Sequence, residues 1–113
     1  MTADEFRQLA LSLPEATEGS HMGHADFRVR RKIFATLGHP AGGWGMVKLT
    51  PPQQAQWVAA HGDVFRPVPG GWGEQGATHV LLARATEGVV RPALLAAWRN
   101  AAPMRLARES ELE

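Results

Sequence analysis

Basic side chains are the groups in this sequence best suited to bind a ligand. They gather in one short run and recur once on a second strand-like segment: Arg28, Arg30, Arg31, Lys32 and Lys48. Guanidinium and ammonium groups placed in this way can contact the phosphates of nucleic acid. Charged residues on the solvent face of an antiparallel sheet also keep its edges from pairing with other chains. The run therefore predicts either a nucleic-acid-binding surface or a solvated sheet face.

Two tryptophans are a second candidate for ligand contact. The tetrapeptide Gly-Gly-Trp-Gly occurs at residues 42–45 and again at 70–73, which places Trp44 and Trp72 in loops before strands. One interpretation is that each ring covers a sheet edge as a hydrophobic clamp. The alternative is that the two loops flank a groove and present both rings for stacking with a base or another planar group.

Metal and nucleotide motifs are weak. His21, His24 and Asp26 have ligand types that suit zinc or iron, but a glycine turn separates the histidines and no second cluster supplies a fourth ligand. Residues 71–76 match G-x-G-x-x-G, yet the next segment is typical of a strand, whereas a dinucleotide motif needs a helix there. We therefore expect no bound metal and no cofactor.

Combinations of residues typical of catalysis are missing from the sequence. It contains no cysteine and no G-x-S-x-G motif, which argues against thiol chemistry and serine hydrolysis. Glu15 and Glu18 lie in a predicted polar linker, where nothing would raise the pKa of either carboxyl. The sequence predicts a binding protein and not an enzyme.

Composition indicates one small globular domain. The chain has 113 residues, of which 44% are hydrophobic and 20% charged, and we place the domain at 1–107 and a polar tail at 108–113. A net charge of +1 means that binding of nucleic acid must come from local clustering. The acidic start lacks an apolar leader and no run could cross a bilayer, so we expect a cytoplasmic monomer without membrane contact.

The pattern of apolar residues predicts an α+β fold. Capping boxes and apolar stripes predict helices near residues 3–13, 51–60 and 88–102, the last burying Trp98. Between them lie strand signals that predict an antiparallel sheet of five or six strands, with the helices packed on one face. The expected strand regions are a short segment before Gly23, residues 25–37, 46–49, 63–69 at an edge, and 78–84.

Residues 25–37 form the centre of this prediction. Phe27, Val29, Ile33, Ala35 and Leu37 share one parity, which predicts a half-buried segment, and a hairpin turn is expected near residues 30–32. Residues 105–113 are expected to be a frayed tail.

Five segments resemble the MmcQ/YjbR family, a bacterial family. They are residues 18–21 (EGSH), 27–30 (FRVR), 32–35 (KIFA), 46–49 (MVKL) and 97–103 (AWRNAAP). The resemblance spans roughly residues 1–107 and implies a CyaY-like α+β fold and a DNA-binding role proposed for the family by structural analogy. This chain departs from the family's pattern at Arg31, where relatives often have glycine, and so carries an extra charge at the predicted turn.

These observations favour weak, sequence-nonspecific binding of duplex DNA through the basic run. Two alternatives stay open. One is a protein-interaction or regulatory domain with an unidentified protein partner, which a large exposed apolar patch would favour. The other is a small-molecule binder, which a pocket with converging polar groups would favour.

Overall fold

The computed structural model describes residues 1–111, with side chains as far as residue 109. Its elements, in chain order, are α1 (Ala3–Leu11), β1 (Ala16–His21), β2 (His24–Val29), β3 (Lys32–Leu37), β4 (Trp44–Lys48), α2 (Pro51–Ala60), β5 (Phe65–Pro67), α3 (Gly71–Glu74), β6 (Ala77–Leu81), the 3-10 turn η1 (Leu82–Arg84), α4 (Glu87–Ala101) and α5 (Met104–Glu111).

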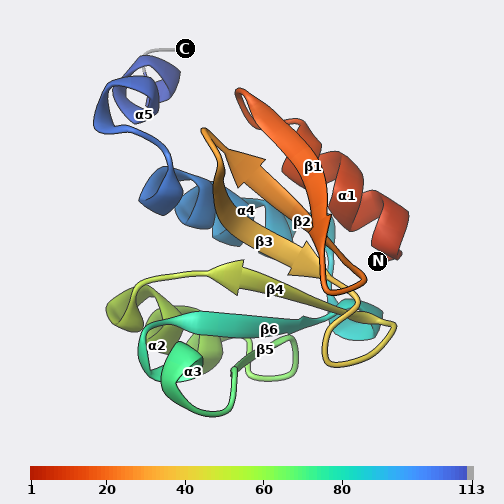
Figure 1. The fold of residues 1–113 in the computed structure, drawn as a ribbon. Helices are drawn as coiled ribbons and strands as arrows, with labels where there is room; N and C mark the ends of the chain where they lie inside the picture. Colours follow the sequence, from red (N-terminus) through yellow and green to blue (C-terminus); the bar gives the residue numbers. More distant parts are fainter. Residues whose placement is uncertain (112–113) are drawn as a thin grey trace.

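The strands form one six-stranded antiparallel sheet in the order β1-β2-β3-β4-β6-β5 (Figure 1). β1, β2 and β3 form a meander, and β5 is the short edge strand that the prolines of the sequence predicted. β3 and β4 share only three residue pairs, from Ala35 with Val47 to Leu37 with Gly45. Beyond these pairs the two strands diverge, which opens the middle of the sheet at one end (Figure 1).

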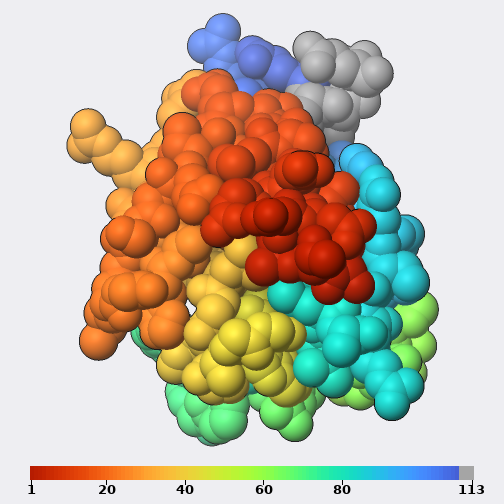
Figure 2. Space-filling view, turned by 90° about the vertical axis from the view of Figure 1, so that its right-hand side faces the viewer, coloured from red at the N-terminus to blue at the C-terminus, as the bar shows by residue number. Residues whose placement is uncertain are grey.

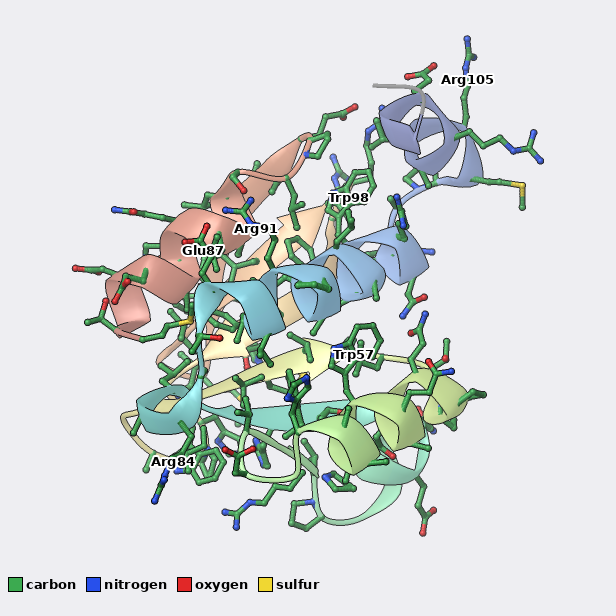
Figure 3. The ribbon with its side chains drawn as sticks, turned by 180° about the vertical axis from the view of Figure 1, so that it is seen from behind. Trp57, Arg84, Glu87, Arg91, Trp98 and Arg105 are labelled. Carbon is green, nitrogen blue, oxygen red and sulfur yellow. The ribbon has the colours of Figure 1, made fainter. Side chains whose placement is uncertain are left out.

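Helices α1, α2 and α4 cover one face of the sheet (Figure 3), so the predicted α+β arrangement is confirmed. Helix α4 contributes the largest buried side chain, Trp98, which is fully inaccessible to solvent. Its indole nitrogen donates a hydrogen bond to the carbonyl oxygen of Pro14 at 2.9 Å. The buried ring therefore packs in the core without leaving its polar atom unpaired.

Local sequence signals explain the start of two helices. The Thr2 hydroxyl accepts from the Glu5 amide at 3.1 Å, and the Glu5 carboxylate accepts from the Thr2 amide at 2.9 Å. Thr50 and Gln53 form the same reciprocal pair at the start of α2. Both capping boxes satisfy amides that a helix leaves without partners in its first turn.

The β2–β3 hairpin turns at two arginines, within the range predicted. Arg30 and Arg31 have φ angles of 50° and 72°, the left-handed region that tight hairpin turns need at both central positions. This geometry gives a physical reason why glycine would suit position 31, since a Cβ atom makes that conformation unfavourable.

The register of β2 with β3 corrects one predicted side-chain orientation. The pairing shifts between Phe27 and Arg28, so the strict alternation expected across the hairpin does not hold. Phe34 is fully buried, whereas Ile33 lies outside the buried core and lines a pocket on the other face. A β-bulge inserts one extra residue and thereby exchanges which side chains face the core.

Three boundaries also differ from prediction. Residues 16–18 were expected in a linker but form the start of β1, where Glu18 pairs with Phe27 of β2. The second Gly-Gly-Trp-Gly segment is not a loop, because residues 71–74 form the short helix α3. Residues 82–84, expected to continue a strand, form the turn η1.

The C-terminal segment is helical where a frayed tail was expected. Helix α5 begins at Met104 and places Leu106 in the core with 9% of its surface exposed. The final part of the predicted tail, residues 112–113, lies outside the described residues. None of the helices within residues 1–111 has the length and apolarity needed to cross a membrane.

The N-terminus is tied to the segment that joins β6 to α4. The Met1 amino group donates to the carbonyl oxygens of Leu82 at 3.0 Å and Ala85 at 3.2 Å. Figure 2 shows the N-terminal residues, in red, lying against this cyan segment. These contacts hold α1 beside α4 on the helical face of the sheet.

Replacing Trp98 with alanine should lower the free energy of unfolding by about 3–5 kcal/mol, because it leaves a large cavity in the core. Urea denaturation followed by circular dichroism measures the change. Trp72→Ala is the matched control, since that ring is 64% exposed and should cost under about 0.5 kcal/mol. Equal midpoints for the two variants would contradict the packing described for Trp98.

Candidate functional site

The sheet face opposite the helices carries a row of side chains that crosses four strands. Residue pairing places Asp26 of β2 beside Thr36 of β3, Thr36 beside Met46 of β4, and Met46 beside His79 of β6. All four are buried, with at most 6% of their surface exposed. We call this side of the sheet the open face. Its centre is therefore a packed, partly polar surface.

Asp26 is fully buried on this face and has two cationic or polar neighbours. Arg28 donates two hydrogen bonds to its carboxylate, from Nε at 2.7 Å and from Nη2 at 2.9 Å. The Nδ1 atom of His21 lies 2.7 Å from Oδ2, the carboxylate oxygen that also accepts from Arg28 Nη2. A Cβ atom on Gly19, the neighbour of Asp26 on β1, would lie only 3.0 Å from a carboxylate oxygen. Glycine at position 19 leaves room for this cluster.

The Arg28 hydrogen bonds are the main reason that the pKa of Asp26 lies below its ordinary value. Burial opposes this shift, and the hydrogen bond from His21 adds to it. A lowered carboxyl pKa stabilises the fold above about pH 3.8, and this stabilisation is lost as the pH falls through the lowered pKa. Arg28, expected to contact phosphate, thus holds a buried carboxylate.

Arg28→Ala should lower the free energy of unfolding at neutral pH by about 2–4 kcal/mol, because it leaves a buried carboxylate without its main partner. Arg30→Ala is the matched control. Its partner Glu15 has 46% of its side chain exposed, so loss of that pair should cost under about 1 kcal/mol. Urea denaturation of both variants tests the difference, and an Arg28 cost as small as that of Arg30 would refute the assigned role.

The other basic residues divide into paired and unpaired groups. Arg30 donates to both carboxylate oxygens of Glu15, at 2.5 Å and 2.9 Å. Arg31, Lys32 and Lys48 are exposed and make no ion pair with any residue in the described part of the chain. The five predicted residues thus supply three cations available to a ligand.

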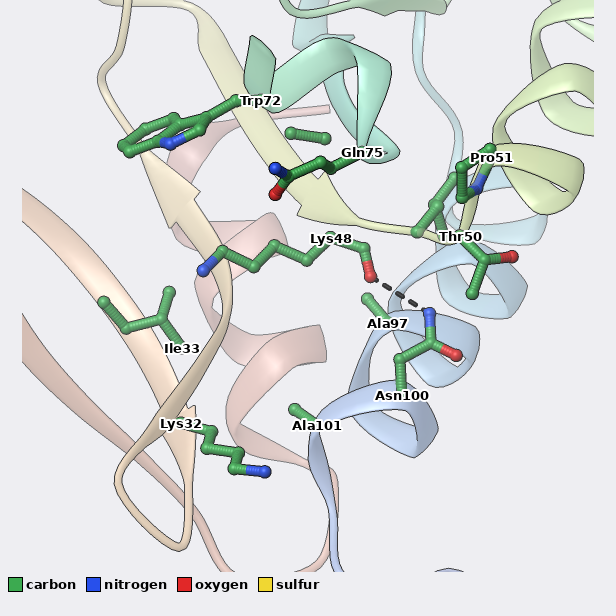
Figure 4. A pocket seen from close by; sticks show the side chains of 12 residues that line it. Lys32, Ile33, Lys48, Thr50, Pro51, Trp72, Gln75, Ala97, Asn100 and Ala101 are labelled. Atoms are coloured by element: carbon green, nitrogen blue, oxygen red, sulfur yellow. Dashed lines mark hydrogen bonds between the residues drawn. The ribbon is translucent and has the colours of Figure 1, made fainter.

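The divergence of β3 from β4 creates a cleft between two of these cations. Lys32 begins β3 and Lys48 ends β4, and both line an open cleft of about 520 Å³, which we call the basic cleft (Figure 4). The ring of Trp72 and the side chain of Asn100 of α4 line it as well, from opposite sides of Lys48. The Asn100 side chain donates to the Lys48 carbonyl oxygen at 3.1 Å, which fixes the end of β4 against α4.

Helix α3 holds Trp72 in this exposed position. Gln54 of α2 donates to the carbonyl oxygens of Gly73 at 3.0 Å and Ala77 at 2.9 Å, which ties α3 to β6. A Cβ atom on Gly73 would lie 1.6 Å from the Val68 carbonyl oxygen, and one on Gly76 would lie 2.0 Å from that of Leu49. Two glycines of the G-x-G-x-x-G pattern are therefore required for close backbone packing.

Trp44 has a different environment from Trp72. The guanidinium carbon of Arg66 lies 4.3 Å from the Trp44 ring centroid, a cation–π contact. The edge of its ring also meets His79, at 5.7 Å between centroids. One face of Trp44 is therefore occupied within the protein, and Trp44 begins the inner strand β4, where a loop was expected. The two tryptophans do not form a matched pair of platforms.

Beside the basic cleft lies a second cavity of about 440 Å³ on the open face. Four histidines line it, and we call it the histidine pocket. Its lining residues are His21, Met22, His24, Ile33, Thr36, His39, Met46, Lys48, Val68, Trp72 and His79. Ile33, Lys48 and Trp72 line both cavities, so the two adjoin. Among the described residues, no group of three or more histidine, cysteine or acidic side chains is arranged to hold a metal ion.

His79 is the most buried of these histidines, with 3% of its surface exposed. Burial is the main reason that its pKa lies below the ordinary value, and the charges of His39 and Arg66 lower it further. A hydrogen bond with the Gly45 backbone acts in the opposite direction. The Nδ1 atom is buried and has no hydrogen-bond partner in the described structure. The ring is therefore neutral near pH 7, with one ring nitrogen unsatisfied.

Because the His79 pKa is lowered by folding, the unfolded chain binds more protons below about pH 6.5. The free energy of unfolding should therefore fall as the pH is lowered from about 7.5 to 5.5. His79→Phe keeps an aromatic ring and removes the titrating group, so it should flatten this part of the profile. Urea denaturation at several pH values measures it, and an identical slope in both proteins would contradict the neutral, buried state of His79.

Comparison with known proteins assigns the fold to a family. The model of the YjbR family matches residues 11–100. The chain belongs to the YjbR family. A solved structure, the Deinococcus radiodurans protein DR2400 with its DUF419 domain, is similar with a TM-score of 0.67 and 17% sequence identity, over 86% of this chain and 75% of that one. No protein with curated annotation matches.

Two features of this YjbR domain were not predicted from sequence. Thr78 and His79 are consecutive polar residues in an otherwise apolar strand, and this pair was a signal that a buried polar site exists. Gln54 lies in α2, and nothing in the sequence indicated that its amide would reach β6. These residues act through contacts between distant segments, which local patterns do not reveal.

Proposed function

We propose that this YjbR-family protein is a non-catalytic, cytoplasmic nucleic-acid-binding protein that contacts DNA weakly and without sequence preference through the basic cleft. The observation that supports this most directly is the arrangement of the cleft itself. Two lysines that make no ion pair with any described residue, and an exposed tryptophan ring, line the same open cavity. Lysine contacts phosphate and tryptophan stacks on a base, which is the combination that nonspecific nucleic-acid binding uses.

Existing ion pairs limit which basic residues can contact the nucleic acid. Arg28 and Arg30 are held by Asp26 and Glu15, so recruiting them to phosphate would break existing ion pairs. Arg31 at the hairpin tip and Lys32 beside it can reach a ligand without that cost. With Lys48 they extend the proposed contact from the hairpin into the basic cleft.

Single-stranded DNA should bind at least as well as duplex DNA. In a duplex the bases are stacked on one another, so Trp72 could contact only the backbone. In a single strand an unstacked base can pack on the exposed ring, and such contacts are worth about 1–3 kcal/mol per base.

Three phosphate contacts predict a slope of log affinity against log salt of about −2.7 for duplex DNA, from about 0.9 for each contact. Fluorescence anisotropy with labelled DNA at several salt concentrations measures this slope. Replacing Lys32 and Lys48 with glutamine should lower its magnitude by about 1.8, because two contacts are lost. No binding at about 50 mM salt would overturn the proposed function.

A charge-matched control separates local contact from net charge. Arg84 and Arg91 lie away from the basic cleft (Figure 3). Lys48 pairs with Ala77 at the start of β6, whereas Arg84 lies in η1, which follows the end of that strand. Arg91 lies on α4 beside Glu87. Replacing both with glutamine changes the net charge equally and should leave the slope unchanged. A loss equal to that of the lysine variant would place the contact elsewhere.

A further inference from the structure

His79, which lines the histidine pocket, has a buried ring nitrogen without a hydrogen-bond partner among the described residues. A neutral imidazole has one donor nitrogen and one acceptor nitrogen. The Gly45 backbone opposes the lowering of the His79 pKa, which is the effect of a carbonyl oxygen beside the ring N–H at Nε2. Nδ1 is then the acceptor, and it is the one buried side-chain polar atom within the described residues that lacks a partner. A molecule that satisfies it must bring an N–H or O–H donor.

The rest of the pocket favours a flat, largely apolar ring. Ile33, Met46 and Val68 supply aliphatic side chains, and Trp72 supplies an aromatic face at the boundary with the basic cleft. A volume of about 440 Å³ is within the range of small-molecule sites and exceeds the needs of a bound water or ion. A pure hydrocarbon would fill this space but leave Nδ1 unpaired, at a cost in free energy.

The positive charge of Lys48 favours a ligand whose ring bears an anionic group. Lys48 lines both the histidine pocket and the basic cleft and has no ion pair among the described residues. A ligand whose ring enters the pocket can therefore place an anionic group on this lysine. A phosphate attached to a planar heterocycle with an N–H edge has this combination of groups.

We propose that the histidine pocket binds the base of a nucleotide, with a ring N–H or amino group donating to His79 Nδ1 and the phosphate held by Lys48. The nucleotide can be free or part of a single DNA strand. Binding of a strand at this pocket rests on the proposed function. Nδ1 is shielded from solvent, so the base must turn the His79 ring or shift a neighbouring ring to reach it. His39, whose ring centroid lies 6.3 Å from that of His79, is exposed and comes from the loop after β3.

The first measurement uses the wild-type protein with histidine labelled by ¹⁵N. Spectra of the histidine rings are recorded during titration with each of the four ribonucleoside 5′-monophosphates, with ribose 5-phosphate as the control that has no base. We expect the Nδ1 resonance of His79 to shift with at least one nucleotide and to remain fixed with ribose 5-phosphate. Failure of every nucleotide and of a short single strand to shift it would overturn the inference.

The second measurement compares a short single-stranded oligonucleotide with an abasic strand of equal length. His79→Phe retains the packing and removes the acceptor, so it should weaken binding of the normal strand about five- to tenfold, the worth of one hydrogen bond, and leave the abasic strand unaffected. Should that variant fail to fold, the ¹⁵N titration of the wild-type protein decides the inference alone.

The outcomes separate the inference from the proposed function. If mononucleotides shift His79 but neither DNA form binds, the pocket serves a free nucleotide and the nucleic-acid function is overturned. If DNA binds with the predicted dependence on Lys32 and Lys48 while the His79 resonance stays fixed and His79→Phe binds normally, the pocket inference is overturned and the proposed function stands.

Discussion

The helices of this protein bury only one face of the sheet, and this constraint determines what the other face contains. Core residues from β2, β3, β4 and β6 meet α4 and α1 on the helical side, with Trp98 at the centre. The open face has no helix over its middle strands (Figure 1), so its side chains must be stabilised by contacts across strands. Asp26 of β2 with His21 of β1, and Trp44 of β4 with Arg66 of β5, are contacts of this kind. Polar chemistry thus accumulates on the face without a helical layer.

The sheet is open at one end, between β3 and β4. β3 and β4 pair over three residues and then separate, and Asn100 of α4 binds the last carbonyl of β4 instead of a neighbouring strand doing so. A cleft results where two lysines at strand ends meet no carboxylate within the described residues. Cations at such ends are less constrained than those in the middle of a strand, where a neighbour on the next strand is always close.

Local patterns in the sequence predicted much of this architecture. The capping boxes at Thr2 and Thr50 and the burial of Trp98 follow from spacing within single helices, and the structure confirms them. The orientation of Ile33 was wrong because a bulge in β2–β3 pairing changes which residues face the core, and spacing along one strand does not reveal it. Helix α5 was missed because its composition is polar, and of its described side chains Leu106 and Ala107 pack on the core.

The candidate site was harder to predict, because charge in a sequence does not reveal partners in space. Arg28 and Arg31 look equivalent in the basic run, yet one holds a buried carboxylate and the other has no ion pair among the described residues. Trp44 and Trp72 occur in identical tetrapeptides. Gly73 packs against the Val68 backbone and its segment forms the helix α3, whereas Gly45 lies in β4 against Phe6. Identical local sequence thus gives one tryptophan a neighbouring cation and leaves the other ring exposed. Contacts made by segments far apart in the chain decide which residues can meet a ligand.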